Sequence, residues 1–205
     1  MKPSCVIFDM GGVVVRFKNY GRFVELLNEA RKDPKIGEKF VGFELGTVSA
    51  EEIRDTFHRI FPLPLDVNVD DFENSKLDDY MGEHDPHIEK AIEKLKANGI
   101  KLGLLTNNGY WSPKRERTTI LDHADEIFDV VVESAREGVR KPDPKIYEIM
   151  LERIGKKAEE CVFVDDLKQN VDAAASLGFI AIHLANEDSE AAVKKLEELL
   201  DLDLH

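Results

Sequence analysis

The stretch Cys5-Val6-Ile7-Phe8-Asp9-Met10-Gly11-Gly12-Val13-Val14-Val15 is the one from which the fold can be predicted. It places a carboxylate directly after a short apolar run, and such a run is typical of a strand that is buried on both faces. A carboxylate in that position is costly unless another group pairs with it. The glycines that follow allow a sharp turn and the close approach of a ligand. Asp9 is therefore the first candidate for a reactive group, although an aspartate at a strand end can also simply cap the next helix.

The composition is that of an ordinary globular chain, with 42% hydrophobic and 34% charged residues in a length of 205. This length suits one α/β domain with room for an insert. A net charge of −13 argues against nucleic-acid and membrane-surface partners. No apolar stretch approaches the roughly 20 residues that span a bilayer, and the N-terminus does not resemble a signal peptide. The two cysteines, Cys5 and Cys161, lie in apolar runs, which is typical of buried thiols in a reduced, cytoplasmic protein.

Residues 17–84 show a pattern of their own. Apolar residues recur at helical spacing twice, first at Tyr20, Phe23, Val24 and Leu27 and then at Ile53, Phe57 and Ile60. Ser49 and Glu52 have the spacing of a capping box that opens the second of these helices. Prolines and an acidic run then interrupt the pattern. We predict a small α-helical cap over residues 17–84, inserted directly after the first strand.

From residue 85 onward, helices and strands alternate regularly. Asp85-Pro86 and Asp143-Pro144 each combine a helix N-cap with a proline at the first helical position. We also expect a helix over residues 118–127. The remaining apolar runs predict strands at 100–105, 130–132, 161–164 and 180–184. Together with the first strand, they predict a Rossmann-like α/β core with a parallel five-stranded sheet and helices on both faces, formed by residues 1–16 and 85–205.

Ligands of parallel α/β sheets bind at the carboxyl ends of the strands. Polar residues stand at four of these ends, namely Asp9, Thr106, Ser134 and the pair Asp165-Asp166. Three carboxylates in one crevice repel each other unless a cation lies between them. Mg²⁺ takes few protein oxygens and keeps several waters, and no histidine or cysteine stands near these ends at a zinc-like spacing. The sequence therefore predicts a Mg²⁺ site that involves these aspartates.

Thr106 and Lys141 complete a pattern that suits a phosphoryl group. Thr106 offers a hydroxyl and a backbone N–H, and Lys141 precedes a proline that stiffens its loop. Phosphoryl transfer depends mainly on positioning and on neutralising charge, and Asp9 would attack phosphorus to form an aspartyl-phosphate. Each residue also has an ordinary interpretation. Thr106 could cap a turn, Lys141 could be a surface lysine, and the Asp165-Asp166 pair could be a helix cap.

Four motifs in order resemble those of the haloacid dehalogenase (HAD) superfamily, in the branch with a helical cap after the first strand. They are Phe8-Asp9-Met10-Gly11-Gly12-Val13, Leu105-Thr106-Asn107-Asn108, Lys141-Pro142-Asp143-Pro144 and Phe163-Val164-Asp165-Asp166. The chain is most similar to the phosphatase domain of soluble epoxide hydrolase and to the HAD domain of some acyl-CoA dehydrogenases. The resemblance covers nearly the whole chain, and only the cap and the tail are weakly constrained. It implies a Mg²⁺-dependent phosphatase that acts on a small phosphorylated metabolite.

The resemblance also implies a role for each matching residue. Asp9 would be the nucleophile and a metal ligand, and the carbonyl of Gly11 and the Asp166 carboxylate would be the other protein ligands of Mg²⁺. Asp165 would act through water or Lys141. Thr106, Asn107 and Asn108 would hold the phosphoryl group or the substrate.

Gly11 departs from the family pattern. Most HAD phosphatases have a second aspartate there, which protonates the leaving group and then activates the water that cleaves the aspartyl-phosphate. Losing such a general acid–base typically costs ~10²–10⁴-fold in rate. Leaving groups that need no proton, such as acyl phosphates, would suffer least. A cap residue could substitute, and the histidines on the cap or at its hinge are His58, His84 and His87, although each is more often an ordinary surface histidine.

Three other functions are compatible with parts of this pattern. A dehalogenase uses an aspartate nucleophile without the second aspartate but needs no Mg²⁺, whereas Asp165-Asp166 favours a metal. A phosphonatase needs a Schiff-base lysine from the cap, and no context marks Lys18, Lys32, Lys35 or Lys39 for that role. The alternative from a different class is a non-catalytic HAD domain that binds a phosphorylated ligand or a protein partner, which Gly11 favours. The sequence indicates neither the substrate nor the oligomeric state.

Overall fold

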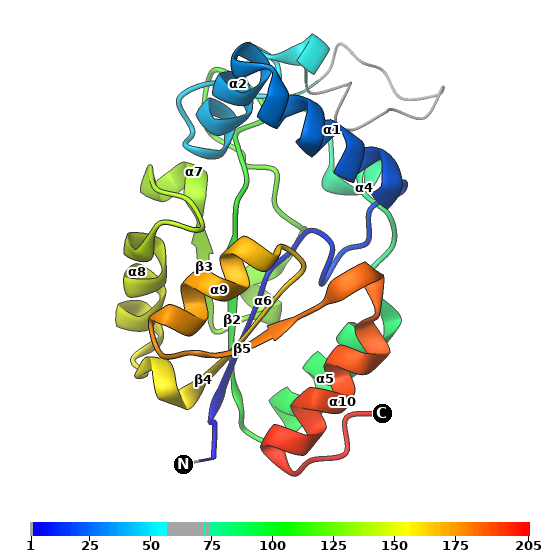
Figure 1. The fold of residues 1–205 in the computed structure, drawn as a ribbon, viewed down its shortest axis with the longest axis vertical. Coiled ribbons are helices and arrows are strands. Elements are labelled where there is room, and N and C mark those ends of the chain that lie inside the picture. The colour runs from blue at the N-terminus through cyan, green and yellow to red at the C-terminus, as the bar shows by residue number, and fades with distance from the viewer. Residues whose placement is uncertain (1, 57–71, 73) are drawn as a thin grey trace.

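Five parallel strands form one sheet in the computed structural model, which describes residues 2–56, 72 and 74–205 (Figure 1). The strand order is β3-β2-β1-β4-β5, with β1 at the centre of the sheet. This confirms the predicted parallel five-stranded α/β fold. The strands are β1 (Cys5–Phe8), β2 (Lys101–Thr106), β3 (Val130–Glu133), β4 (Cys161–Asp165) and β5 (Ile180–His183).

Helices cover both faces of the sheet because side chains alternate along each strand. Val6 and Phe8 pack with the apolar stripes of α5 (Pro86–Ala97) and α10 (Ser189–Leu200), whereas Cys5 and Ile7 pack toward α8 (Pro144–Ile154) and α9 (Lys168–Ser176). Both cysteines are buried and reduced, as predicted. The shorter helices of the core are α6 (Ala124–Ile127), α7 (Ser134–Glu137) and the 3₁₀ turns η1 (Ala158–Glu160) and η2 (Ala185–Glu187).

The two predicted aspartate–proline helix starts are confirmed. Asp85 accepts hydrogen bonds from the amides of His87 and Ile88, and Asp143 accepts one from the amide of Lys145. The prolines that follow occupy the first helical positions, where an N–H would have no partner within the helix.

The helix expected over residues 118–127 is wrong for most of its length, because only Ala124–Ile127 is helical. Thr118 instead forms an antiparallel bridge with Tyr110. The amide of Thr119 donates to the carbonyl of Gly109 over 2.7 Å, and these contacts hold the segment extended. Two consecutive β-branched threonines favour the extended conformation over a helix.

The described part of residues 17–84 contains α1 (Tyr20–Lys32), α2 (Pro34–Glu44) and α4 (Leu77–Tyr80), which lie beyond the carboxyl edge of the sheet (Figure 1). The predicted capping box is confirmed, since the amide of Ser49 donates to Glu52 over 2.8 Å and the amide of Glu52 donates to Ser49 Oγ over 3.3 Å. Phe57, His58 and Ile60 lie outside the described residues. The division of the chain into a core and a cap at these boundaries stays a prediction.

The end of α2 packs tightly against the loop that follows β2. A Cβ atom on Gly109 would lie 2.1 Å from the ring of Phe43, so only glycine allows this contact. Just beyond α2, the amide of Ala50 donates to the carbonyl of Tyr110 over 2.8 Å. These contacts place the aromatic residues of α2 above the carboxyl ends of the strands. Among the helices that the structure describes, none has the length and apolar character needed to cross a membrane.

Candidate active site

Lys141 is the residue that joins the ends of three strands. Its Nζ atom lies 2.7 Å from Oδ1 of Asp9 after β1, 2.8 Å from Oδ2 of Asp165 on β4, and 2.8 Å from the carbonyl oxygen of Leu105 on β2. Only 1% of Lys141 is exposed, so it is not a surface lysine. A buried ammonium group between two carboxylates fixes the position of both of them.

Asp165 is fully buried and bonded to its neighbours. Its Oδ1 atom accepts hydrogen bonds from the amide of Leu167 over 2.8 Å and from Nδ2 of Asn170 over 3.0 Å. Asn170 is itself 1% exposed and was not among the predicted site residues. Its position on the first turn of α9, five residues after Asp165, is the sequence feature that could have identified it. These bonds fit the predicted indirect role of Asp165 through Lys141.

Asp166 points toward Gly12. Its Oδ2 atom is buried and has no hydrogen-bond partner among the described residues. A Cβ atom on Gly12 would lie 2.7 Å from that oxygen, and Gly12 has a φ of +75°, which side chains rarely adopt. Gly12 therefore gives Asp166 the space it occupies. A buried carboxylate oxygen without a donor is the kind of atom that a cation would satisfy.

The three aspartates carry more negative charge than the protein compensates. Oxygen atoms of Asp9, Asp165 and Asp166 lie within 4.8 Å of one another, and the single ammonium group of Lys141 lies between two of them. Burial raises the pKa of Asp9 to about 7, against the opposing charge of Lys141. Burial and the charges of Asp9 and Asp165 raise the pKa of Asp166 well above its usual range. Burial favours the neutral form of Lys141, but the two aspartates outweigh it and raise its pKa. This set of hard oxygen donors fits Mg²⁺.

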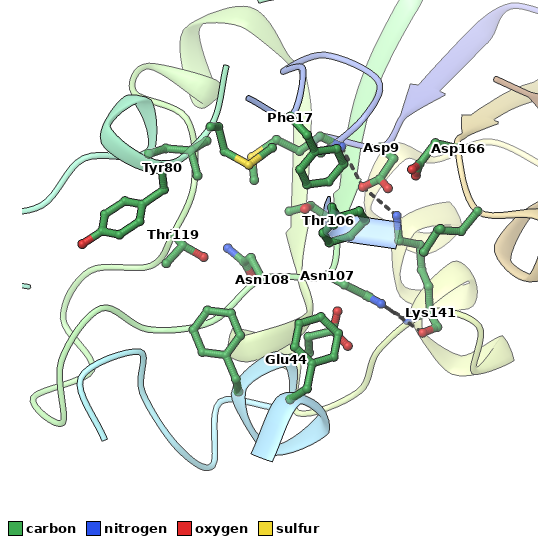
Figure 2. A pocket seen from close by; sticks show the side chains of 18 of the residues that line it. Asp9, Phe17, Glu44, Tyr80, Thr106, Asn107, Asn108, Thr119, Lys141 and Asp166 are labelled. Atoms are coloured by element: carbon green, nitrogen blue, oxygen red, sulfur yellow. Dashed lines mark hydrogen bonds and ion pairs between the residues drawn. The ribbon is translucent and has the colours of Figure 1, made fainter. Parts of the chain in front are cut away.

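A cavity opens beside these carboxylates (Figure 2). Figure 2 shows Asp9, Lys141 and Asp166 close together at one end of the cavity. The predicted site residues that line it are Asp9, Gly11, Thr106, Asn107, Asn108, Lys141 and Asp166. The structure therefore brings together every predicted site residue, with Asp165 directly behind Lys141.

The two asparagines after Thr106 are already bonded within the protein. The Asn107 carboxamide donates to the backbone carbonyl of Lys141 over 3.0 Å and accepts from the backbone amide of Lys141 over 2.8 Å. Nδ2 of Asn108 donates to Glu133 over 2.6 Å, and the amide of Asn108 donates to Ser134 Oγ over 3.0 Å. Both residues thus hold the loops of the site in place, and their contact with a substrate stays a prediction.

Trp111 follows the Thr106 motif, which indicates either a pocket or a core position, and it lines the cavity, whereas most of the remaining described wall was not predicted from the sequence. Aromatic and apolar side chains form most of it, and Glu44 at the end of α2 is the carboxylate that this region adds. Oε2 of Glu44 lies 2.5 Å from Nε of Arg140, the residue before Lys141. Burial raises the pKa of Glu44 to about 6, although Arg140 opposes the shift. The apolar members of the wall are Met10, Phe17, Phe23, Phe40, Phe43, Leu77, Tyr80, Met81, Trp111 and Leu167.

The side chains nearest to Gly11 are apolar. A Cβ atom there would lie 3.3 Å from Cζ of Phe17 and 3.6 Å from Cε of Met81, and φ is not positive. His84 is one of the histidines that could replace the missing acid–base. Its Nδ1 atom lies 3.8 Å from Oε1 of Glu89 at the surface. Neither His84 nor His87 is among the described residues that line the cavity.

A parallel α/β sheet with this strand order and an aspartate–lysine site at its carboxyl edge defines a hydrolase of the HAD type. The chain belongs to the haloacid dehalogenase-like hydrolase family, whose sequence model matches residues 3–178. The resemblance inferred from the four motifs is therefore confirmed.

Similar proteins include known phosphatases. The chain is 33% identical over 98% of its length to acyl-CoA dehydrogenase family member 10 of Mus musculus, and it spans only 19% of that protein. It is 34% identical to the sesquiterpene phosphatase astK of Aspergillus oryzae, over 96% of both chains. A HAD family enzyme from Bacteroides thetaiotaomicron, crystallised as a magnesium complex, has the same fold with a TM-score of 0.66 and 20% identity, over 94% of this chain and 98% of that one.

Proposed function

We propose that this protein is a Mg²⁺-dependent phosphatase that hydrolyses a small phosphorylated metabolite through an aspartyl-phosphate on Asp9. The observation that carries the proposal is the contact of Asp9 with the buried ammonium group of Lys141 at the base of a cavity. An aspartate held in this way, beside two further carboxylates, suits metal-assisted phosphoryl transfer. The phosphatase astK, which is similar over almost its full length, supports the same activity class.

The geometry of Asp9 favours one of its oxygens as the nucleophile. Oδ1 accepts from the backbone amide of Met10 over 2.7 Å and from Lys141 over 2.7 Å. These two donors fix the carboxylate, so that Oδ2 is the atom we expect to attack phosphorus. The bond from phosphorus to the leaving oxygen then breaks, and the leaving oxygen takes its proton from solvent water. A second water later attacks phosphorus to release phosphate and restore Asp9.

Other residues of the site would orient and neutralise the phosphoryl group. Asp9, Asp166 and the carbonyl oxygen of Gly11 would hold Mg²⁺. When bound, the ion offsets the negative charge of the phosphoryl oxygens. Lys141 would add a second positive charge, and we expect Thr106 and Asn107 to contact the phosphoryl oxygens from the β2 side. None of these residues supplies a proton to the leaving oxygen, which is the consequence of Gly11.

One observation favours a second candidate function. The described atoms nearest to a Cβ on Gly11 belong to Phe17 and Met81, and neither side chain is ionisable. A HAD domain that binds a phosphorylated ligand or protein without hydrolysing it would need the same anion site but no acid–base. Catalysis remains the better account, because the nucleophile, the lysine and the acidic cluster are all present.

A phosphatase assay with activated substrates tests the proposal. Acetyl phosphate and 4-nitrophenyl phosphate should be hydrolysed in the presence of Mg²⁺ and not after chelation. Asp9→Asn keeps the size of the side chain but removes the nucleophile, and it should abolish turnover. Asp125→Asn, at an exposed position on α6, serves as the matched control and should keep full activity. Binding of phosphate esters without any Mg²⁺-dependent hydrolysis would support the binding domain instead.

A further inference from the structure

We infer that the substrate is a phosphate monoester whose alcohol part is an apolar alkyl or aryl group, which lies against the aromatic wall of the cavity. The inference rests on the proposed function and adds the chemical class of the substrate. Three features support this substrate class. They are the aromatic side chains of the cavity wall, the hydrogen bonds that already occupy most polar groups among them, and the ion pair between Glu44 and Arg140.

The described cavity wall around the carboxylates is built largely from aromatic rings on several separate segments. Phe17, before α1, and Phe23 on α1 stack with ring centroids 3.9 Å apart and an interplanar angle of 15°. Tyr80 of α4 and Trp111 after β2 lie with centroids 5.1 Å apart. Figure 2 shows Phe17 and Tyr80 at different sides of the same cavity. Phe43 of α2 also lines this cavity. Aromatic surfaces of this kind bind apolar groups.

Most polar groups in this wall are occupied by other protein groups. Nδ2 of Asn108 donates to Glu133, Thr119 Oγ1 accepts from the amide of Gly109 over 3.2 Å, and the Tyr80 hydroxyl lies 3.3 Å from Ser75 Oγ. The Oδ1 atom of Asn108 has no hydrogen-bond partner among the described residues and could accept one bond. A sugar or polyol carries several hydroxyls, and it would lose bonds to water that this wall does not replace.

Glu44 is the carboxylate that the described residues add to this part of the wall, and its charge is neutralised. Glu44 pairs with Arg140 over 2.5 Å, and 6% of Glu44 is exposed. It therefore presents no net charge that would select a cationic substrate. Among the described residues that line the cavity, the other charged groups are Asp9, Lys141 and Asp166, which belong to the phosphoryl end.

The phosphoryl end and the aromatic wall belong to one cavity, so a single molecule can occupy both. With its phosphorus at Asp9, a monoester must direct its alcohol group away from the carboxylates and toward the aromatic wall. Each methylene that leaves water on binding is worth up to about a fourfold change in affinity. We therefore expect affinity to rise with chain length until the chain extends past the wall.

Alkylphosphonates test this without catalysis, because their carbon–phosphorus bond is not hydrolysed. Titration calorimetry of the Mg²⁺-loaded protein should give Kd values that fall by up to about fourfold per methylene from methyl- to butyl- to hexylphosphonate. 3-Hydroxypropylphosphonate, similar in length to butylphosphonate, should bind at least about fivefold more weakly than butylphosphonate, because its hydroxyl must leave water. Equal affinity across the alkyl series, or tighter binding of the hydroxyl compound, would overturn the inference.

A pair of variants on neighbouring residues locates the effect in the wall. Phe40 lines the cavity, whereas Val41 on the same helix is 37% exposed. The readout is the ratio of kcat/KM for hexyl phosphate to kcat/KM for acetyl phosphate. Phe40→Ser should lower this ratio about tenfold, Phe40→Leu should keep most of it, and Val41→Ser should not change it. A ratio unaffected by Phe40→Ser would contradict the assignment of the wall.

The same assays separate a failure of the inference from a failure of the proposed function. If acetyl phosphate is hydrolysed but sugar phosphates are preferred to hexyl phosphate, the protein is a phosphatase and the substrate class is wrong. If no phosphate ester is hydrolysed but phosphonate affinity still rises with chain length, the apolar site stands and the catalytic proposal fails.

Discussion

The ring of Phe17 lies 3.3 Å from the point at which a side chain on Gly11 would begin. Backbone conformation does not require glycine at this position, because φ is not positive. A Cβ atom added here would need the ring to move by a few tenths of an ångström. Gly11 thus differs from Gly12, where both the backbone and the Asp166 carboxylate exclude a side chain. Gly11 is therefore the position of this loop at which a substitution can be tested.

Gly11→Asp should therefore increase steady-state turnover of an aryl phosphate, by about 10²-fold if the new carboxylate reaches the position of a general acid–base. Without that group, we expect hydrolysis of the aspartyl-phosphate to be the slow step, so the parent protein should show a burst of alcohol before a slow steady state. Rapid-quench kinetics would detect the burst and its loss in the variant. A parent without a burst, and no gain in the variant, would indicate that another residue already activates the water.

Gly12→Ala should destabilise the protein and weaken Mg²⁺ binding. A left-handed conformation costs an alanine about 1–2 kcal/mol, and the added Cβ would also lie 2.7 Å from Asp166. Gly99→Ala is the matched control, since Gly99 has a φ of +72° and nothing within 4 Å of an added Cβ. Urea unfolding should show a loss of about 1–2 kcal/mol for Gly99→Ala and a clearly larger one for Gly12→Ala. Equal losses in the free energy of unfolding would mean that the Asp166 side chain moves away from the new Cβ without an energetic cost.

Asp166→Asn should remove the stabilisation that Mg²⁺ gives to the fold. A ligand that binds only the native state at 100 times its Kd stabilises it by about 2.7 kcal/mol. The variant should lose this response and yet unfold no more easily without metal, because it removes one of three clustered buried carboxylates. Thermal melts with and without Mg²⁺ measure both effects, with Asp125→Asn as the control. An unchanged Mg²⁺ response in Asp166→Asn would exclude this residue as a ligand.

Glu44→Gln should change how stability depends on pH. The folded-state pKa of about 6 lies above the value near 4.5 of an unfolded glutamate, so the folded protein holds this proton to higher pH. The raised pKa of Glu44 therefore adds about 2 kcal/mol to the free energy of unfolding below pH 4.5, and this contribution is lost as the pH rises through 6. Relative to Glu44→Gln, the parent should therefore become less stable between pH 4.5 and 7. A constant difference in unfolding free energy across this range would show that the pKa of Glu44 is not raised.

The fold could be predicted because each strand is a short apolar run and because α5 and α8 each begin at an aspartate cap followed by proline. The catalytic end of the site was predictable for a related reason. Asp9, Thr106 and Asp166 directly follow or end central strands, and parallel strands bring their carboxyl ends to one edge.

Apart from Trp111, which follows β2, the aromatic wall and Glu44 were not predicted because they come from the region beyond the sheet, where no strand register fixes which helix face meets the core. Phe43 reaches the cavity through its contact with Gly109, a tertiary contact that no local pattern encodes. One sequence feature did point to this region. Seven of the 11 phenylalanines stand between residues 17 and 84.

The aspartyl-phosphate itself is the most direct test of the account. The protein should be mixed with an aryl phosphate and Mg²⁺, quenched in acid within milliseconds, and digested for mass spectrometry. The account predicts one phosphorylated peptide, modified at Asp9 and absent from Asp9→Asn. Substrate turnover without phosphate on Asp9, or with phosphate on another residue, would contradict it.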